Sequence, residues 1–325
     1  MKKNVFKKII AGALCLGLTA SFAACNSGTK DIPVIGIAQY GEHGSLDNCR
    51  DGFLQGLEKA GLTEGVDYTL DVQNASFDDA IDSQIAQKFA DENVSLMVGI
   101  ATPSAQACFN AAEEKDIPVI FTAVTDPVGA KLDAGNITGT SDVLPVEGQL
   151  QLIRALQPEA KTIGIIYTTS ESNSLYSIEQ YEKLAGDYGF IIDAVAVTAQ
   201  AEVTQAVDKL LADKVDCLSN LTDNNVVGVL PAILEKTDAA GIPVYGSEIE
   251  QVKLGCAAGA GLDYVKLGIQ TGEMAAKVLK GEAKCQDLPY QIIVDYDLYV
   301  NSQVLTALGL ELPADLADTA VECGA

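Results

Sequence analysis

Several polar side chains of this sequence follow directly after short apolar runs, where they could bind a small molecule. Thr102, Pro103 and Ser104 come after the run Leu96–Ile100 and are typical of a helix start, with Thr102 as the N-cap. The backbone N–H groups of a helix start are unpaired and favour an anion such as a carboxylate. The candidate ligand-binding residues in such places are Tyr40, Thr102, Ser104, Thr122, Val124, Asp126, Ser172, Asn173, Asp223, Asn224 and Glu248.

The charges of these candidates predict a ligand that carries both signs. Asp223, with Glu248 as the second choice, could hold an ammonium group. The helix starts at Ser104 and at Ser172 and Asn173 could hold a carboxylate. An amino acid has both groups, so a small zwitterion of this kind is the expected ligand. Each acid could equally be a solvated carboxylate or a helix cap.

The sequence has few residues that could bind a phosphorylated ligand, and it has no recognisable catalytic motif. Arg50 and Arg154 are the two arginines, and both lie in predicted helices. His43 is the one histidine, and no serine-hydrolase elbow, zinc helix or phosphate-binding loop motif occurs. We therefore expect a binding protein with no enzymatic activity, no metal and no cofactor.

The first 24 residues have the pattern of a bacterial export signal. Four lysines precede the apolar stretch 9–22, which is shorter than the roughly 20 residues that span a bilayer. Ala23, Ala24 and Cys25 then resemble a lipobox, so Cys25 is predicted to be lipidated and residues 25–31 to form a tether. The net charge of −24 disfavours nucleic acid and anionic lipid, so the lipid alone should attach the chain to the membrane.

Six further cysteines are scattered along the rest of the chain without a Cys-x-x-Cys motif. This spacing argues against a metal cluster or a redox motif. We expect mostly small buried thiols, and a disulfide stays open as an alternative.

Apolar runs and helical patterns alternate from residue 31 onward in two series, which indicates an α/β fold with parallel sheets. Strands are predicted at Val34–Ala38, Tyr68–Gln73, Leu96–Ile100 and Val119–Phe121, and then at Ile163–Tyr167, Ile191–Val195, Cys217–Asn220 and Val244–Tyr245. Helices are predicted near Ser45–Ala60, Asp78–Asp91, Ser104–Lys115, Glu147–Leu156, Ser174–Tyr188, Glu202–Ala212 and Val226–Ala239.

Three segments of the first series recur in the second in the same order. "IGIAQYGEHGSL" is similar to "IGIIYTTSESNSL", "NVSLMVGIATPSA" to "KVDCLSNLTDNNV", and "DIPVIFTAV" to "GIPVYGSEI". The repeat favours two similar lobes over one large sheet. Ligands of parallel α/β sheets bind beyond the carboxyl ends of the strands, so two facing lobes would form a cleft lined by the candidate residues.

Longer motifs carry a family resemblance over about Val34–Leu312. They are "QYGEHGSLDNCRDGFLQGLEKAG", "IATPSAQA", "VIFTAVTDPVGAKL", "NITGTSD", "TDNNVV" and "GLDYVKLGIQTGEMAAKVLKG". Together they resemble the ABC-transporter substrate-binding family, and within it the tryptophan/tyrosine-type amino-acid binders. The sequence departs from that pattern at Gly44, where a proline is frequent, and at Gly246–Glu248, which is one residue longer.

The resemblance implies a type I periplasmic-binding fold, in which two Rossmann-like lobes with parallel sheets are joined by three crossings. We expect residues 32–141 and 260–283 in the first lobe and residues 142–259 and 284–313 in the second. The glycine-rich Gly255–Gly261 is expected to be a flexible crossing. Residues 314–325 form an acidic tail without an assigned role.

The resemblance also implies a lipid-anchored, extracytoplasmic receptor that closes on an amino acid. By analogy with the tryptophan/tyrosine-type binders, this amino acid is expected to have an aromatic side chain. Its expected partners are the small-molecule ligand and an ABC permease with its ATPase, and the protein is expected to be a monomer. Two alternatives stay open at this point. The protein could present its ligand to a signalling partner as a sensor, or it could bind another small polar solute such as a purine.

Overall fold

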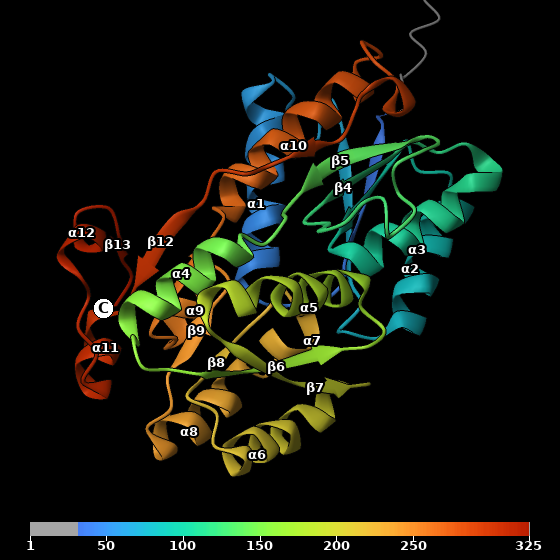
Figure 1. Ribbon diagram of the computed structural model, residues 1–325. Helices are drawn as coiled ribbons and strands as arrows, with labels where there is room; N and C mark the ends of the chain where they lie inside the picture. Colours follow the sequence, from blue (N-terminus) through green and yellow to red (C-terminus); the bar gives the residue numbers. More distant parts are fainter. Residues whose placement is uncertain (1–31, 325) are drawn as a thin grey trace, which may run out of the picture. The chain divides into compact units, whose positions relative to one another are not determined.

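Two β-sheets organise residues 32–324, the part of the chain that the computed structural model describes (Figure 1). The predicted export signal, Cys25 and the tether lie outside the described residues. Each sheet is covered by its own helices and has its own apolar core. Among the described residues, no helix is both long and apolar enough to cross a bilayer.

The first sheet has six parallel strands in the order β11-β5-β4-β3-β1-β2. Its central strand β3 is buried at all five residues, as expected for a parallel sheet with helices on both faces. The strands are β1 (Val34–Gln39), β2 (Thr69–Asn74), β3 (Leu96–Ile100), β4 (Val119–Thr122), β5 (Ile137–Ser141) and β11 (Gln291–Ile292). The helices of this lobe are α1 (Gly44–Lys59), α2 (Asp79–Asp91), α3 (Thr102–Ala112) and α10 (Tyr264–Leu279).

The second sheet has seven strands in the order β13-β12-β10-β9-β8-β6-β7, with β12 antiparallel to β10. The strands are β6 (Thr162–Thr168), β7 (Ile191–Val197), β8 (Cys217–Ser219), β9 (Val244–Gly246), β10 (Ala258–Gly261), β12 (Asp297–Val300) and β13 (Val321–Glu322). The helices are α4 (Val146–Leu156), α5 (Ser172–Leu184), α6 (Val203–Asp213), α7 (Asn224–Val227), α8 (Leu230–Ala240), α9 (Ile249–Leu254), α11 (Ser302–Leu308) and α12 (Ala314–Ala317).

The two lobes repeat one topology. The order β2-β1-β3-β4-β5 of the first sheet recurs as β7-β6-β8-β9-β10 in the second. The prediction of two similar Rossmann-like lobes with parallel sheets is therefore confirmed. The sequence repeats begin in β1 and β6, around β3 and β8, and around β4 and β9, which are equivalent strands of the two sheets.

The chain crosses between the lobes three times, at residues 142–145, 262–263 and 294–296. The third crossing lies later than expected, because residues 284–293 belong to the first lobe. Cys285 is buried in the first core, and β11 pairs with β5 at Gln291 and Ile292. The second crossing also starts later, since Ala260 and Gly261 still pair within the second sheet.

One segment was assigned wrongly from the sequence. Gly255–Gly261 contains the buried strand β10 instead of a flexible crossing, and its glycines allow backbones to pack closely. A Cβ added at Gly259 would lie 2.4 Å from the carbonyl oxygen of Gly246. The acidic tail contains α12 and β13, which pairs with β12.

The start of α3 also differs by one residue from the prediction. Ala101 is the N-cap and Thr102 the first helical residue, so the Thr102 hydroxyl does not cap the helix. The six cysteines of the described residues are free, and five of them are buried. No group of three or more His, Cys, Asp or Glu within residues 32–324 is arranged to hold a metal ion.

Helices α1 and α10 pack side by side through glycines, although they are far apart in the sequence (Figure 1). Gly52 and Gly56 of α1 face Gly268 and Gly272 of α10. A Cβ added at Gly268 would lie 2.3 Å from the carbonyl oxygen of Cys49, so the contact is between backbones. This contact fixes the end of the second crossing against the helix that follows β1.

We expect Gly268→Val to lower the free energy of unfolding by roughly 1–3 kcal/mol, because the two helices must separate. Urea denaturation of the purified protein measures the change. Gly186→Ala is the matched control, since no atom lies within 4 Å of the added Cβ. It should change the stability by less than about 0.5 kcal/mol. Equal stability of Gly268→Val and the wild type would contradict the packing described here.

Candidate functional site

A cavity with about 340 Å³ of empty space, including the part that opens to solvent, lies between the carboxyl ends of the two sets of strands. Both lobes and the first crossing contribute to its wall. The lining residues are His43, Ser45, Leu46, Ala101, Ala123, Thr125, Asp142, Asn173, Thr222, Asn224, Val227, Glu248, Gln251 and Tyr264. None of these residues of the described chain is Arg or Lys, whereas two of them are acids.

The first lobe lines the cavity with the loops that follow β1, β3 and β4. His43, Ser45 and Leu46 come from the β1–α1 loop and the first turn of α1. Ala101 and Ala123 directly follow β3 and β4 in buried positions. The strand-end rule that predicted a site here therefore describes the geometry of this wall.

Ala101 and Ala123 both have positive φ angles, of 80° and 57°. The Ala101 values of φ 80° and ψ 159° lie in a region that is essentially restricted to glycine. Such strain is concentrated at functional sites, where the surrounding structure holds it in place. Here it lies at the turn of the chain from β3 into α3.

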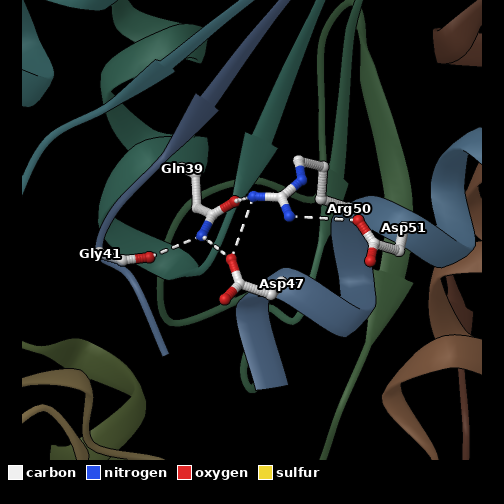
Figure 2. A network of polar contacts seen from close by, with 5 residues as sticks. All are labelled: Gln39, Gly41, Asp47, Arg50 and Asp51. Carbon is white, nitrogen blue, oxygen red and sulfur yellow. Dashed lines mark hydrogen bonds and ion pairs between the residues drawn. The ribbon is translucent and has the colours of Figure 1, made fainter. Parts of the chain in front are cut away.

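A network of hydrogen bonds around Arg50 holds the β1–α1 loop in place (Figure 2). Arg50 Nη1 donates to Gln39 Oε1 and to Asp47 Oδ1, both at 3.0 Å. The Gln39 amide donates to the carbonyl oxygen of Gly41 at 2.8 Å and to Asp47 at 2.9 Å. The arginine therefore stabilises the loop that carries His43 and does not line the cavity itself.

Asp142 lines the cavity from the first crossing, where it is 2% exposed. Its carboxylate accepts from Thr125 Oγ1 at 3.0 Å and from the Tyr264 hydroxyl at 2.8 Å. Burial raises the pKa of Asp142 to about 6. Since Tyr264 begins α10, this carboxylate joins the first crossing to the end of the second.

Glu248 is the second acid of the cavity wall and the N-cap of α9. It accepts from the backbone N–H groups of Glu250 at 2.6 Å and Gln251 at 2.9 Å, and from the Ser45 hydroxyl of the other lobe. Burial raises the pKa of Glu248 to about 7. Both Asp142 and Glu248 also raise the pKa of Tyr264 electrostatically, so their charges act on the same part of the cavity.

Glu171 is a buried carboxylate behind the second-lobe wall that sequence reasoning missed. Its oxygens accept from the backbone and side-chain amides of Asn224 and Asn225 and from the side-chain amide of Asn173. Burial and the nearby charge of Asp223 raise the pKa of Glu171 to about 8. This carboxylate orients Asn173 and Asn224, two of the predicted ligand-binding residues.

Among the eleven predicted residues, Asn173, Asn224 and Glu248 line the cavity. Asp223 is fully buried outside the lining and accepts from the Thr168 N–H and hydroxyl, from Ser174 Oγ and from the Val226 N–H. Its lone pairs are used to fix the start of α7. The ammonium proposal therefore moves from Asp223 to the two acids of the wall.

The other predicted residues of the first lobe also lie outside the lining. The Ser104 hydroxyl bonds Asp82 at 2.8 Å, and the Tyr40 hydroxyl donates to Asp79 at 2.8 Å. Thr122, Val124 and Asp126 follow or end β4, the first two fully buried. They support the wall from behind.

Thr102 and Ser172 are the first helical residues of α3 and α5, next to lining residues. Their hydroxyl oxygens are buried and have no hydrogen-bond partner among the described residues. Each therefore keeps an unused donor and acceptor close to the cavity.

Asp142 and Tyr264 were missed because the strands before them were missed. Asp142 follows β5, whose sequence Ile137–Ser141 has few apolar residues, and Tyr264 follows the glycine-rich β10. Both residues belong to the family-like motifs "NITGTSD" and "GLDYVKLGIQTGEMAAKVLKG". Extending the strand-end rule to those two motifs would have found them.

Besides the Ser45–Glu248 bond, three hydrogen bonds connect the lobes around the cavity. His43 Nε2 lies 3.3 Å from Asn224 Oδ1, and Thr125 Oγ1 lies 3.4 Å from Thr222 Oγ1. At the outer edge, Asn48 donates to Glu250 Oε1 at 3.0 Å. The cavity is therefore enclosed by lobes that are in contact.

Comparison with known proteins decides the class of this site. The model of the family "ABC transporter substrate binding protein" matches residues 34–323. The chain belongs to this family. It is a substrate-binding protein that works with an ABC transporter, and not an enzyme; such proteins act outside the cytoplasm. These expectations from the sequence are confirmed.

The chain is similar to a tyrosine-binding protein of Clostridioides difficile strain R20291, with 37% identity over 96% of this chain and 94% of that protein. It is also similar to a solved ABC domain in complex with L-Trp from Streptococcus pneumonia. That structure is 32% identical, covers 90% of this chain and 99% of its own, and has a TM-score of 0.85.

A third similar structure is the ligand-free, open form of a substrate-binding protein with adhesive properties from Clostridium difficile. It is 40% identical and covers 90% of this chain and 99% of its own, yet its TM-score is 0.66. Residues 32–324 thus resemble the L-Trp complex more closely, although its identity is lower. Together with the three bonds between the lobes, this indicates a closed arrangement.

The buried carboxyl groups predict how stability depends on pH. The pKa values of Asp82 and Asp142 are raised to about 6, that of Glu248 to about 7 and that of Glu171 to about 8. The folded state therefore binds more protons than the unfolded state between about pH 4 and 8, and these groups lose their stabilising effect as the pH rises.

We expect the melting temperature of the ligand-free protein to fall between pH 5 and 8, measured by calorimetry. Glu248→Gln should flatten this dependence between pH 5 and 7, by an effect on the order of 1–3 kcal/mol. Glu235→Gln, at an exposed position of α8, should leave it unchanged. A melting temperature that rises through this window would contradict the protonation described here.

Proposed function

We propose that this protein captures an L-α-amino acid with an aromatic side chain and delivers it to an ABC permease. The observation that carries the proposal is a closed cavity whose wall holds two buried acids and a helix start, with no Arg or Lys among the described lining residues. A zwitterion is the small molecule whose charges complement that arrangement.

The ammonium group is assigned to Asp142 and Glu248. Two buried carboxylates that face one cavity repel each other, and an ammonium group between them would favour the ionised form of both. Burial raises the pKa of both groups, and a bound ammonium group would lower it again. Binding should therefore release protons near pH 6.5 and strengthen as the pH rises toward 8.

The carboxylate is assigned to the start of α3. Ala101 lines the cavity, and the N–H groups of Thr102 and Ser104 together with the free Thr102 hydroxyl follow directly. The start of α5 at Ser172 is the alternative site for the carboxylate, since the Ser172 hydroxyl is also buried and without a partner among the described residues.

An aromatic side chain is supported by the relatives, one named as tyrosine-binding and one solved with L-Trp. The wall also contains apolar surface on which a ring can lie. Leu46, Ala101 and Tyr264 come from the first lobe, and Val227 comes from the second.

The export signal, the acylation of Cys25 and the monomeric state complete the proposal. The basic residues, apolar stretch and Ala-Ala-Cys sequence of the N-terminus support lipid anchoring at the outer face of the membrane. Contact between closed lobes forms the state that a permease can recognise.

We expect Asp142→Asn and Glu248→Gln each to weaken the binding of L-tyrosine by roughly 10- to 100-fold, since the ammonium group loses an ionised partner. Isothermal titration calorimetry on protein freed of endogenous ligand measures the affinity. Glu235→Gln is the control and should bind as the wild type does.

A ligand without the ammonium group makes this test specific. 3-(4-Hydroxyphenyl)propionate should bind the wild type weakly, and neither substitution should weaken it further. If both variants bound L-tyrosine with wild-type affinity, the ammonium assignment would be wrong. If no amino acid bound the wild type, the proposed function itself would be wrong.

We expect Cys25→Ser to release the protein from the membrane, because serine carries no thiol for the lipid. Fractionation of expressing cells followed by mass spectrometry of the N-terminal peptide measures this. Membrane retention of the serine variant in unchanged amount would contradict lipidation at Cys25.

A further inference from the structure

Two buried atoms of the cavity-lining residues have no hydrogen-bond partner among the described residues. They are Oδ1 of Asn173 and Nδ1 of His43. Buried polar atoms in native proteins are almost always paired, so two such atoms on residues that line one cavity indicate a ligand that supplies a donor there. Which ligand group can do so depends on whether each atom accepts or donates.

The amide of Asn173 presents its oxygen as an acceptor. Its nitrogen Nδ2 donates to Glu171 Oε2 at 3.0 Å and to the carbonyl oxygen of Thr222 at 2.9 Å. A carbonyl oxygen can only accept, so the opposite orientation of the amide would place two acceptors together. The unpaired atom of Asn173 is therefore an oxygen that requires a donor.

The imidazole of His43 presents an acceptor for a related reason. The nitrogen Nδ2 of Asn224 donates to Glu171 Oε2 at 2.6 Å, which leaves Asn224 Oδ1 as an acceptor facing His43 Nε2 at 3.3 Å. Nε2 must then carry the proton. Burial lowers the pKa of His43, so the ring is neutral at pH 7 and Nδ1 is a free lone pair.

The two acceptors belong to one part of the cavity, because Glu171 Oε2 contacts the amides of both Asn173 and Asn224. The His43 ring is also held in place from behind. It stacks on Phe77 with ring centroids 6.3 Å apart and planes at 4°, and Phe77 packs edge-on against Tyr40. The acceptors are therefore fixed before the ligand binds.

We propose that the side chain of the bound amino acid donates a hydrogen bond to Asn173 Oδ1 or His43 Nδ1, so that this cavity selects aromatic side chains with an O–H or N–H group. The inference rests on the proposed function. A ligand carboxylate has no proton to give to these atoms, and the two acids Asp142 and Glu248 bind the ammonium group better than neutral acceptors do. A phenol or an indole fulfils the requirement, and a phenyl ring does not.

The first test compares ligands of similar shape by calorimetry on the wild-type protein. L-tyrosine and p-amino-L-phenylalanine carry a donor, whereas L-phenylalanine and p-fluoro-L-phenylalanine lack one. We expect the two donors to bind roughly 10- to 100-fold more tightly, because the other ligands leave the acceptors unpaired. Equal affinities across the four ligands would overturn the inference and leave the proposed function standing.

The second test combines the ligands with substitutions. His43→Phe or Asn173→Ala, whichever removes the acceptor that the ligand uses, should lower the ratio of tyrosine to phenylalanine affinity toward one, mostly by weakening tyrosine. Asn136→Ala is the matched control, since that amide bonds Asp116 away from the cavity and should leave the ratio unchanged.

Other outcomes separate the competing explanations. Equal weakening of tyrosine and phenylalanine by both substitutions would mean that His43 and Asn173 bind the main-chain groups of the ligand or only support the wall, and would overturn the inference. Failure of every amino acid to bind the wild type would overturn the proposed function and this inference together.

Discussion

A set of buried carboxyl groups at and behind the cavity wall is the constraint on which the rest of this structure depends. Asp142, Glu171, Asp223 and Glu248 are each at most 2% exposed. A buried carboxylate is stable only where donors surround it, so each one fixes the loop that supplies them. Asp223 and Glu171 take their donors from the second lobe, and those loops are thereby made rigid. Asp142 lies in the first crossing and Glu248 in the second lobe, and both line the cavity.

The source of the hydrogen-bond donors explains why Asp223 and Glu171 support the wall, whereas Asp142 and Glu248 are assigned to the ligand. Asp223 accepts four hydrogen bonds from its own lobe, which leaves little for a ligand. Glu248 accepts from α9 in the second lobe and from Ser45 in the first. A positive ligand group at Glu248 would therefore stabilise the contact between the lobes as well as the charge, and binding would favour closure.

The sequence predicted the fold well because its signals are local and repeated. Apolar runs such as Leu96–Ile100 became strands at the expected residues, and the repeat of three segments predicted two lobes of one topology. The prediction failed where a strand is held by close backbone packing and has few large apolar side chains. β10 consists of alanine and glycine, since Gly259 and Gly261 lie against the backbone of the neighbouring strand, and composition alone made it resemble a flexible link. Because β10 was not predicted, Tyr264 was missed as a site residue. Asp142 was missed in the same way, because β5 was not predicted.

The candidate site could be located from the sequence, but the roles of its residues could not. The strand-end rule found the loops that carry Asn173, Asn224 and Glu248. It could not distinguish a residue that lines the cavity from one that lies behind the wall. Asp223 and Asn224 are adjacent in the loop after β8, and only Asn224 lines the cavity. The amides show the consequence most clearly. Asn173 and Asn224 have no charge and no characteristic spacing, yet Glu171 fixes which atom each presents, and that choice determines which ligand group the wall can accept.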